Sequence, residues 1–361
     1  MTFIFPWQIL IFFVSFSIIS FALDKSGFFK WCAYKTAKLA KHDGLKLFNY
    51  LFLIIATITF FTANDIVILT LTPFILHIGL RHNKHPKAYL FMLFFVANTG
   101  SLGHLLGNLT NIMIANVIGI SFMKFLSVLF VPMIAALVVE YIILRLLFNK
   151  EIKEMFVIKS DNTNKLIDNK YEMKLSLLLL GSIIFLAIFE PLHKIPLWVY
   201  SLGALILMLI LTNYHKIDLA KKMPWKIIIG VSILFVIVNF IPLDKIISLI
   251  SSNGSFLTIL IAILIAALLS GIINNLPATI LMSTALAGLS IQNVEPLIYS
   301  TIIGSNIGAN LIISGSLAGL MWLHLIKEKG YKISWGEFSK IGFIVTIPVI
   351  IVVSLVLWLI L

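Results

Sequence analysis

Long apolar runs separated by short polar segments dominate the chain. Four of them, residues 45–61, 122–148, 174–189 and 337–361, are nearly unbroken. A helix needs roughly 20 apolar residues to cross a bilayer, whereas soluble domains mix polar and apolar residues every few positions. The pattern therefore predicts an all-α polytopic membrane protein with no soluble domain between its spans.

Four polar breaks interrupt the other apolar segments. Two lie in the first half, TAND at 62–65 and NTGSLGHLLGN at 98–108, and two in the second half, GIINNLP at 271–277 and GSNIGANLIISGS at 304–316. Unpaired backbone groups at membrane depth are tolerated only where they line a polar cavity or are buried in protein. We therefore expect the four breaks to converge on one polar site.

The breaks of the two halves match in order and spacing. A shift of 208 positions places Asn98 on Asn306, and a shift of 211 places Asn64 on Asn275. Similar breaks that recur at nearly one offset indicate an internal duplication. The predicted parts are, in order, a first repeat, a cytoplasmic connector and a second repeat: 1–148, 149–173 and 174–361.

The positive charges predict the orientation. Segment 46–80 is too long for one crossing and too short for two, which favours a re-entrant hairpin; segment 255–290 is expected to form another that enters from the opposite side. With these hairpins, the Lys and Arg residues gather on one face, as the positive-inside rule predicts for the cytoplasmic face. The exceptions are Lys124, Lys194 and Lys245. The predicted fold is thus an inverted repeat with two re-entrant hairpins and two discontinuous transmembrane helices, a plan that recurs among secondary transporters.

Composition excludes several other classes of protein. The net charge of +12 does not indicate nucleic-acid binding, because the lysines lie between hydrophobic segments rather than on one basic face. The single cysteine, Cys32, excludes a disulfide framework and a thiolate cage for a metal or metalloid. The first apolar run has no basic leader and no small-residue cleavage site, so we interpret it as a retained helix. The chain has no Gly-Lys-Ser/Thr phosphate loop, so we expect that it does not itself take energy from ATP. We also expect no enzymatic activity, no cofactor and no metal site.

Asp65, in the break TAND, is the sharpest chemical signal. A carboxylate at membrane depth costs about 2.5–3.5 kcal/mol on insertion scales and usually serves cation binding, proton relay or substrate contact. Asp65 is therefore the predicted cation-binding or proton-coupling residue. The alternative is that its carboxylate caps the half-helix 66–80, and the two roles are compatible.

Amide and hydroxyl side chains in the breaks are the predicted substrate contacts, because they donate and accept hydrogen bonds without a fixed charge. For each one, the alternative is ordinary hydrogen bonding between transmembrane helices. The predicted substrate-binding residues are Asn64, Asn98, Thr99, Ser101, Asn108, Asn274, Asn275, Ser305, Asn306, Asn310 and Ser316. Glycines in the same breaks would permit unwound backbone, or simply close helix packing. The predicted backbone breaks lie at Gly100, Gly107, Gly308 and Gly315.

The remaining titratable residues are interpreted as structural. His104 lies inside a break, where a hydrogen-bonded structural histidine is more common than a proton relay. Glu140 and Glu190 are expected near span ends, where side chains reach water. No Lys or Arg lies in any break, so an anionic substrate would be held by helix N-termini and amides.

The motifs at these breaks resemble those of the arsenite/antimonite efflux permeases (ArsB type) of the ion transporter superfamily. The matching stretches follow in order along nearly the whole chain: LDKSGFF (23–29), ANDIVILTLTP (63–73), NLTNI (108–112), NNLPA (274–278), GSNIGANLIISGSLAGLMWLHL (304–325), ISWGEF (333–338) and TIPV (346–349). The resemblance implies proton-coupled export of trivalent metalloid hydroxides by a multi-pass protein of the bacterial cytoplasmic (inner) membrane. It also implies action either alone or with a soluble ATPase partner, and such scaffolds often form homodimers.

The chain departs from this family pattern in three ways. Family members typically begin with about two further spans. The pattern has aspartates where this chain has Asn98 and Asn306, and a lysine where it has Asn310. Of the acidic positions in the pattern, only Asp65 is acidic in this chain. Two alternatives therefore stay open. One is a sodium-coupled anion (dicarboxylate-type) transporter or sodium/proton antiporter of the same superfamily, and the other is a transport-dead paralogue or assembly partner.

Overall fold

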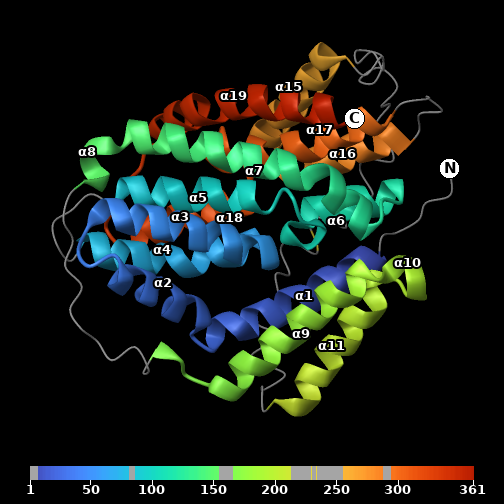
Figure 1. Cartoon of the computed structure of the whole chain (residues 1–361), viewed down its shortest axis with the longest axis horizontal. Helices are drawn as coiled ribbons and strands as arrows, with labels where there is room; N and C mark the ends of the chain where they lie inside the picture. Colours follow the sequence, from blue (N-terminus) through green and yellow to red (C-terminus); the bar gives the residue numbers. More distant parts are fainter. Residues whose placement is uncertain are drawn as a thin grey trace.

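The computed structural model describes residues 7–80, 86–153, 166–212, 255–287 and 294–361, together with Ile229 and Ile233. Every regular element in these ranges is helical, which confirms the all-α prediction (Figure 1). Five described helices are long and apolar enough to cross a membrane, or six if the bent pair Leu10–Lys25 and Phe28–Leu39 counts as one span. The predicted multi-pass membrane protein is therefore confirmed.

The long apolar runs of the sequence form the long helices. These are α3 (Gly44–Phe61), α7 (Phe122–Leu147), α9 (Lys170–Ile188), α15 (Phe256–Ile273) and α19 (Trp335–Ile360). Side chains such as Phe130 and Val138 on α7 and Ile351 on α19 are exposed although they are apolar. An apolar outer face of this kind suits contact with lipid.

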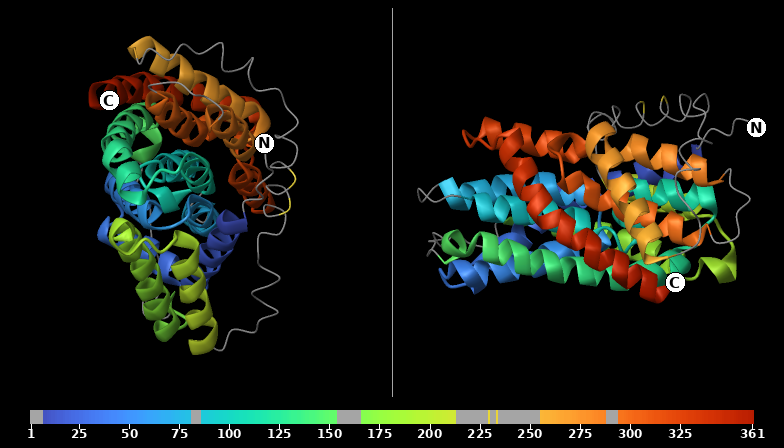
Figure 2. Two further views of the ribbon diagram at one scale, coloured as in Figure 1. Left: turned by 90° about the vertical axis from the view of Figure 1, so that its right-hand side faces the viewer. Right: turned by 90° about the horizontal axis from the view of Figure 1, so that it is seen from above.

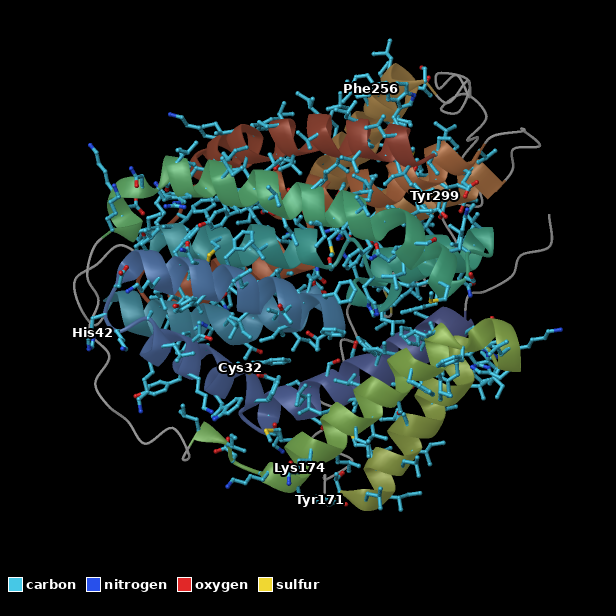
Figure 3. The ribbon with its side chains drawn as sticks, in the orientation of Figure 1. Cys32, His42, Tyr171, Lys174, Phe256 and Tyr299 are labelled. Atoms are coloured by element: carbon cyan, nitrogen blue, oxygen red, sulfur yellow. The ribbon has the colours of Figure 1, made fainter. Side chains whose placement is uncertain are left out.

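Two of these helices turn back at a polar break. α3 is followed by α4 (Asn64–Leu80), and α15 is followed by α16 (Asn275–Ala287). His42, just before α3, lies at the left edge of the molecule in Figure 3, and Phe256, the first residue of α15, lies near its top. The predicted end of the second hairpin, at 288–290, lies outside the described residues.

Two further helices are interrupted by tight turns. In the first half, α5 (Lys87–Gly100) leads through the 3-10 turn η1 (Leu105–Gly107) into α6 (Leu109–Ile118). In the second half, α17 (Glu295–Ile307) leads through η3 (Gly308–Asn310) and η4 (Ile313–Gly315) into α18 (Leu317–Glu328).

The two interruptions share their backbone geometry. His104 and Ile312, which precede the turns, have φ/ψ of −131°/128° and −135°/137°. A Cβ added to Gly107 would lie 3.0 Å from the Cα of Ser101, and one added to Gly315 would lie 3.0 Å from the Cα of Ala309. In both comparisons the corresponding residues of the two halves are 208 positions apart, which is the spacing found in the sequence.

Matching helices of the two halves also pack reciprocally. α4 packs on α18, while its counterpart α16 packs on α6; α7 packs on α19. α7 ends where α8 (Asn149–Ile152) follows it, whereas α19 ends on the opposite side, at the C-terminus (Figure 1). The two longest helices thus run in opposite directions.

Aromatic packing fixes the first interrupted helix against the second half. The rings of Phe94 and Trp322 are 5.2 Å apart, and those of Phe91 and Phe338 are 5.7 Å apart. All four side chains are fully buried. This cluster joins α5 to α18 and α19 and so positions the break that follows α5.

A second group of helices lies beside this body. α1 (Trp7–Lys25) packs on α9 and α11 (Leu197–Leu211), and α9 and α11 lie on the other side of the molecule from α15 and α19 (Figures 1 and 2). The shorter α2 (Phe28–Leu39) links α1 to α3, and α10 (Glu190–His193) lies between α9 and α11 along the chain. The predicted connector lies partly outside the described residues, and α9 begins inside it, at Lys170.

Candidate functional site

A chain of three amides joins the two halves of the molecule. Asn64 Nδ2, at the start of α4, donates to Asn98 Oδ1 over 2.9 Å. Asn98 Nδ2, in the last turn of α5, donates in turn to Asn310 Oδ1, also over 2.9 Å. Three of the four breaks therefore meet, as expected, and they meet through the side chains named from the sequence.

Asn306 is the centre of a second polar cluster. Its Oδ1 accepts from Asn108 Nδ2 at 2.9 Å and from Ser101 Oγ at 3.4 Å. Its Nδ2 donates to Asn111 Oδ1 at 2.6 Å and to the carbonyl of Ile302 at 2.8 Å. A carboxylate has no N–H to donate to these two acceptors. The amide is therefore the side chain that this position requires.

The Asn98–Asn310 pair explains another departure from the family pattern. The resemblance implies an aspartate at position 98 and a lysine at position 310, which are opposite charges. Here the two side chains contact each other directly as neutral amides. Losing both charges together leaves no unpaired buried ion, which would be costly. The contact between Asn98 and Asn310 is neutral but hydrogen-bonded.

Four half-helices begin at the breaks, with first residues Asn64, Leu109, Asn275 and Leu317. Asn108 caps α6 through the N–H of Thr110, and Ser316 caps α18 through the N–H of Gly319. Helix N-termini carry a partial positive charge and favour oxygen-rich ligands.

The fourth break is held by backbone contacts. Asn274 has φ +84° and ψ 148°, a conformation that is costly for any residue except glycine. Its Nδ2 donates to the carbonyl of Ser314 at 3.1 Å, and its Oδ1 accepts from the N–H of Leu276 at 3.3 Å. Ser270 Oγ likewise donates to the carbonyl of Ser305. The strained turn between α15 and α16 is thus tied to the break between α17 and α18.

Asp65 lies in the first turn of α4 and is partly exposed. The N–H of Asp65 donates to Asn64 Oδ1 at 2.9 Å, so the Asn64 amide contacts the exposed end of the helix. Within the described residues, no hydrogen bond or ion pair engages the Asp65 carboxylate. The capping role considered for this carboxylate is not seen, and the group is free to bind a proton or cation.

Other predicted site residues are buried without joining the amide clusters. The hydroxyls of Thr99 and Ser305 have no hydrogen-bond partner within the described part of the chain. Asn275 is buried at the start of α16. Among the glycines, an added Cβ at Gly308 would lie 2.4 Å from the carbonyl oxygen of Ala267, whereas Gly100 leaves 3.3 Å to that of Ala56.

Two buried side chains near the first break were missed or misplaced by sequence reasoning. Asn111 is fully buried and donates to the carbonyls of Ser101 and His104. Its spacing of one helical turn from Asn108 is the signal that could have found it. Glu140 was expected near water at a span end, and this is wrong: it is 1% exposed inside α7. A carboxylate within 26 helical residues that are otherwise mostly apolar was the available signal.

His104 also differs from expectation. It is buried, but within the described residues neither ring nitrogen has a hydrogen-bond partner. Its ring lies between those of Phe60, at 5.0 Å, and Phe122, at 5.1 Å. It is therefore held by aromatic contacts rather than by hydrogen bonds.

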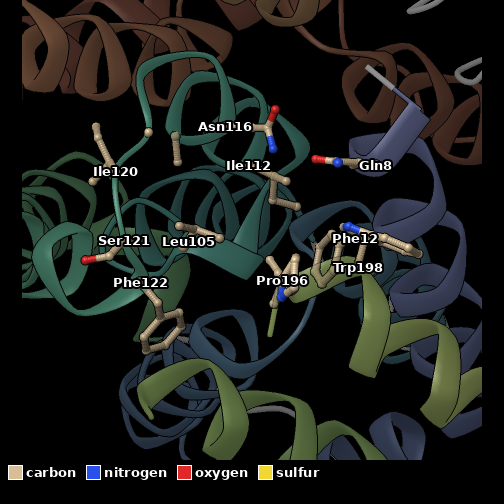
Figure 4. Close-up of a pocket in the computed structure, with 13 residues that line it drawn as sticks. Gln8, Phe12, Leu105, Ile112, Asn116, Ile120, Ser121, Phe122, Pro196 and Trp198 are labelled. Atoms are coloured by element: carbon tan, nitrogen blue, oxygen red, sulfur yellow. The ribbon is translucent and has the colours of Figure 1, made fainter. Parts of the chain in front are cut away.

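A cavity of about 460 Å³ lies beside the first break (Figure 4). Leu105 of η1 lines it, and Gln8 of α1 and Asn116 of α6 extend toward each other across it. Pro196 and Trp198, at the start of α11, form another wall. The cavity carries amide and hydroxyl groups but no charged side chain among its lining residues.

Metal or thiolate chemistry has no assembled site in the part of the chain described. No group of three or more His, Cys, Asp or Glu side chains there is arranged to hold a metal ion. Cys32 lies in α2, outside the four breaks.

The sequence profile of the family described as arsenical pump membrane protein (ArsB) matches residues 2–361. The chain belongs to this family. It is 31% identical to the arsenical pump membrane protein of Escherichia coli (strain K12) over 369 residues, which cover 96% of this chain and 85% of the relative. A putative arsenical pump membrane protein of Bacillus subtilis (strain 168) is 28% identical, covering 94% and 84%, and a 46 kDa membrane protein of Mycobacterium leprae is 26% identical, covering 98% and 86%.

Family membership confirms the resemblance drawn from the motifs. Together with the apolar helices, it makes the chain a multi-pass transporter of the bacterial inner membrane from the arsenical pump family.

Proposed function

We propose that this transporter exports arsenite and antimonite from the cytoplasm in exchange for protons. The observation that carries the proposal is the pair of hydrogen-bonded amide clusters beside one free carboxylate, where the breaks of both halves meet. Family membership supports an arsenical as the solute.

The chemistry of the clusters suits a neutral trihydroxide. Each hydroxyl of such a solute both donates and accepts hydrogen bonds, as an amide does. The solute would exchange with the existing amide–amide bonds, so binding leaves few buried groups unpaired. Since Cys32 lies outside the breaks, the proposed binding is by hydrogen bonds and not through a thiolate.

Asp65 is the proposed proton site. It is one residue from Asn64, whose side chain belongs to the amide chain, and it stands at the positive end of α4. Proton binding removes the charge at this helix end, while proton release restores it. Alternation between a protonated Asp65 and an occupied amide cluster would couple the two fluxes.

We further propose that the two halves form an inverted repeat with two re-entrant hairpins and a site between them. The opposite directions of α7 and α19 and the packing of α4 on α18 and of α16 on α6 support this arrangement. The cavity beside η1 would then be the route to the outer face. Partnership with a soluble ATPase and homodimer formation stay predictions of the resemblance.

One observation favours a second candidate function. The helix N-termini at the breaks would also attract an anion, which suits sodium-coupled uptake of a dicarboxylate. The absence of Lys and Arg from the breaks and the membership of the arsenical pump family weigh against it. A transport-dead paralogue would need neither the free Asp65 carboxylate nor the hydrogen-bonded amide clusters.

The test is arsenite resistance and efflux in a metalloid-sensitive bacterium. Wild type should confer resistance, and Asp65→Asn should lower the efflux rate by about tenfold or more, which corresponds to roughly 1.4 kcal/mol or more in activation free energy. Asp43→Asn, which changes a carboxylate outside the site, is the matched control. Sodium-dependent dicarboxylate uptake without arsenite efflux would favour the second candidate. No transport by either wild type or Asp65→Asn, although both reach the membrane, would favour a transport-dead chain, and unchanged efflux in Asp65→Asn would overturn the role of Asp65.

A further inference from the structure

Glu140 is the most deeply buried carboxylate described in this protein. It lies in α7, 1% exposed, and both carboxylate oxygens are without a hydrogen bond among the described residues. A buried carboxylate normally has a cation or several donors, because an unpaired charge in the interior is very costly. Among the described residues, no partner compensates for burying the Glu140 carboxylate as a charged group.

The surroundings of Glu140 lead directly to the first break. The Thr99 hydroxyl is close enough to interact with the carboxylate, yet it too lacks a well-formed hydrogen bond. Thr99 follows Asn98, the middle member of the amide chain that reaches Asn64 beside Asp65. The end of α5 therefore lies between the Glu140 carboxylate and the amides.

Other charged groups on the elements packed against α7 are paired elsewhere or lie near helix ends, and α8, which follows the end of α7, carries Lys150 and Glu151. Lys87 of α5 pairs with Glu337 of α19, and Lys340 of α19 is exposed. On α9, Glu172 and Lys174 lie at the start of the helix. The remaining titratable residue near η1 is His104, enclosed by aromatic rings. None of these side chains forms an ion pair with Glu140 in the described structure.

We propose that Glu140 is a second proton-binding carboxyl group of the transport cycle, on the α7 side of the first break. This inference rests on the proposed proton-coupled export. A proton bound to Glu140 neutralises the buried group, and the freed carboxylate must find solvent or a donor when the proton leaves. Movement of α5 relative to α7 would supply that access, so proton release is tied to the break that holds Asn98.

The experiment uses the purified full chain in liposomes with radioactive arsenite. Two fluxes are compared: exchange of arsenite across the membrane without a pH gradient, and uphill accumulation driven by an imposed pH gradient. Glu140→Gln keeps the shape of the protonated side chain, but its amide cannot bind and release a proton as a carboxyl group does. We expect it to retain exchange and to lose uphill accumulation by about tenfold or more.

Glu295→Gln is the matched control, since Glu295 pairs with Lys124 at the surface over 2.8 Å. This variant should behave as wild type.

If Glu140→Gln accumulates arsenite like wild type, the inference is overturned. Should that variant not insert, Glu140→Asp keeps a titratable group, and its uphill flux should show an altered pH profile; an unchanged profile would also overturn the inference. A wild type that exchanges no arsenite would instead refute the proposed function, and this inference with it.

Discussion

The two halves of the molecule share a backbone plan but differ in their chemistry. The first half places three titratable side chains at or beside its breaks: Asp65, His104 and Glu140. Apolar residues occupy the matching positions of the second half. Leu276 lies 211 positions after Asp65, and Ile312 lies 208 positions after His104. Val353 lies as far from the cap of α19 as Glu140 lies from the cap of α7. Symmetry of the fold therefore does not extend to charge.

This difference teaches how two halves with similar helix breaks can differ in the chemistry that they contribute. Amides are present in both halves, and the hydrogen bonds between them cross from one half to the other. Among the described residues, the carboxyl groups at the breaks belong to the first half. We infer that solute contact is shared between the halves, whereas proton coupling belongs to the first.

The largest expected effect comes from restoring charge across the halves. Asn98→Asp or Asn310→Lys alone would place an unpaired ion beside a neutral amide, which costs about 3–5 kcal/mol when a buried pair is incomplete. The double variant would re-form a charge pair at the 2.9 Å contact. We expect each single variant to lose efflux and the double variant to recover part of it.

A double-mutant cycle on membrane abundance and efflux measures this coupling. Single variants that behave like wild type would mean that the two side chains do not face each other in a dry site.

The next effect concerns packing of the interrupted helices. Gly308→Ala forces a methyl group to 2.4 Å from the Ala267 carbonyl oxygen, whereas Gly100→Ala meets the Ala56 carbonyl oxygen at 3.3 Å. Overpacking of this kind costs about 1–3 kcal/mol. Gly308→Ala should therefore lower the melting temperature in detergent clearly more than Gly100→Ala does. Equal shifts would show that the second break is not more tightly packed.

Opposite orientation of the halves is tested by labelling. Asn116 in α6 and His324 in α18 occupy matching positions, and both are exposed. In a Cys32→Ser background, Asn116→Cys should react with an impermeant maleimide from outside intact cells, and His324→Cys only in everted vesicles. Reaction of both from one side would contradict the inverted repeat. Cys32→Ser itself should leave efflux unchanged.

The smallest effect concerns the N-terminal caps of α3 and α15. Asp43 caps α3 by accepting from the N–H of Lys46 at 3.0 Å, and Ser255 caps α15 in the same way. This backbone hydrogen bond lowers the pKa of Asp43 below its ordinary value. The cap therefore stabilises the folded state above that ordinary value, and its contribution is lost as pH falls through the lowered pKa.

Thermal unfolding at acidic and neutral pH tests whether the stabilising contribution of the Asp43 cap is lost in acid. The melting temperatures of wild type and Asp43→Asn should differ only at acidic pH, since Asn is an equally good cap without a charge. Ser255→Asn should change stability without such a pH dependence.

The sequence by itself determined the helices, the four breaks and the family. Helix length and apolar character are local properties, so the run 122–148 directly predicted α7, at Phe122–Leu147. Polar residues within apolar segments marked the breaks, because membrane helices tolerate them only at special places. The recurrence at 208 positions was likewise visible without coordinates.

Only the tertiary structure decided which polar side chains meet. Asn98 and Asn310 are 212 residues apart, and nothing local to either one specifies the other as its partner. Glu140 looked peripheral because it is near the end of an apolar run, yet packing of α7 buries it beside Thr99. Burial and hydrogen-bond partnership depend on how helices pack across the chain, and a one-dimensional pattern does not contain that information.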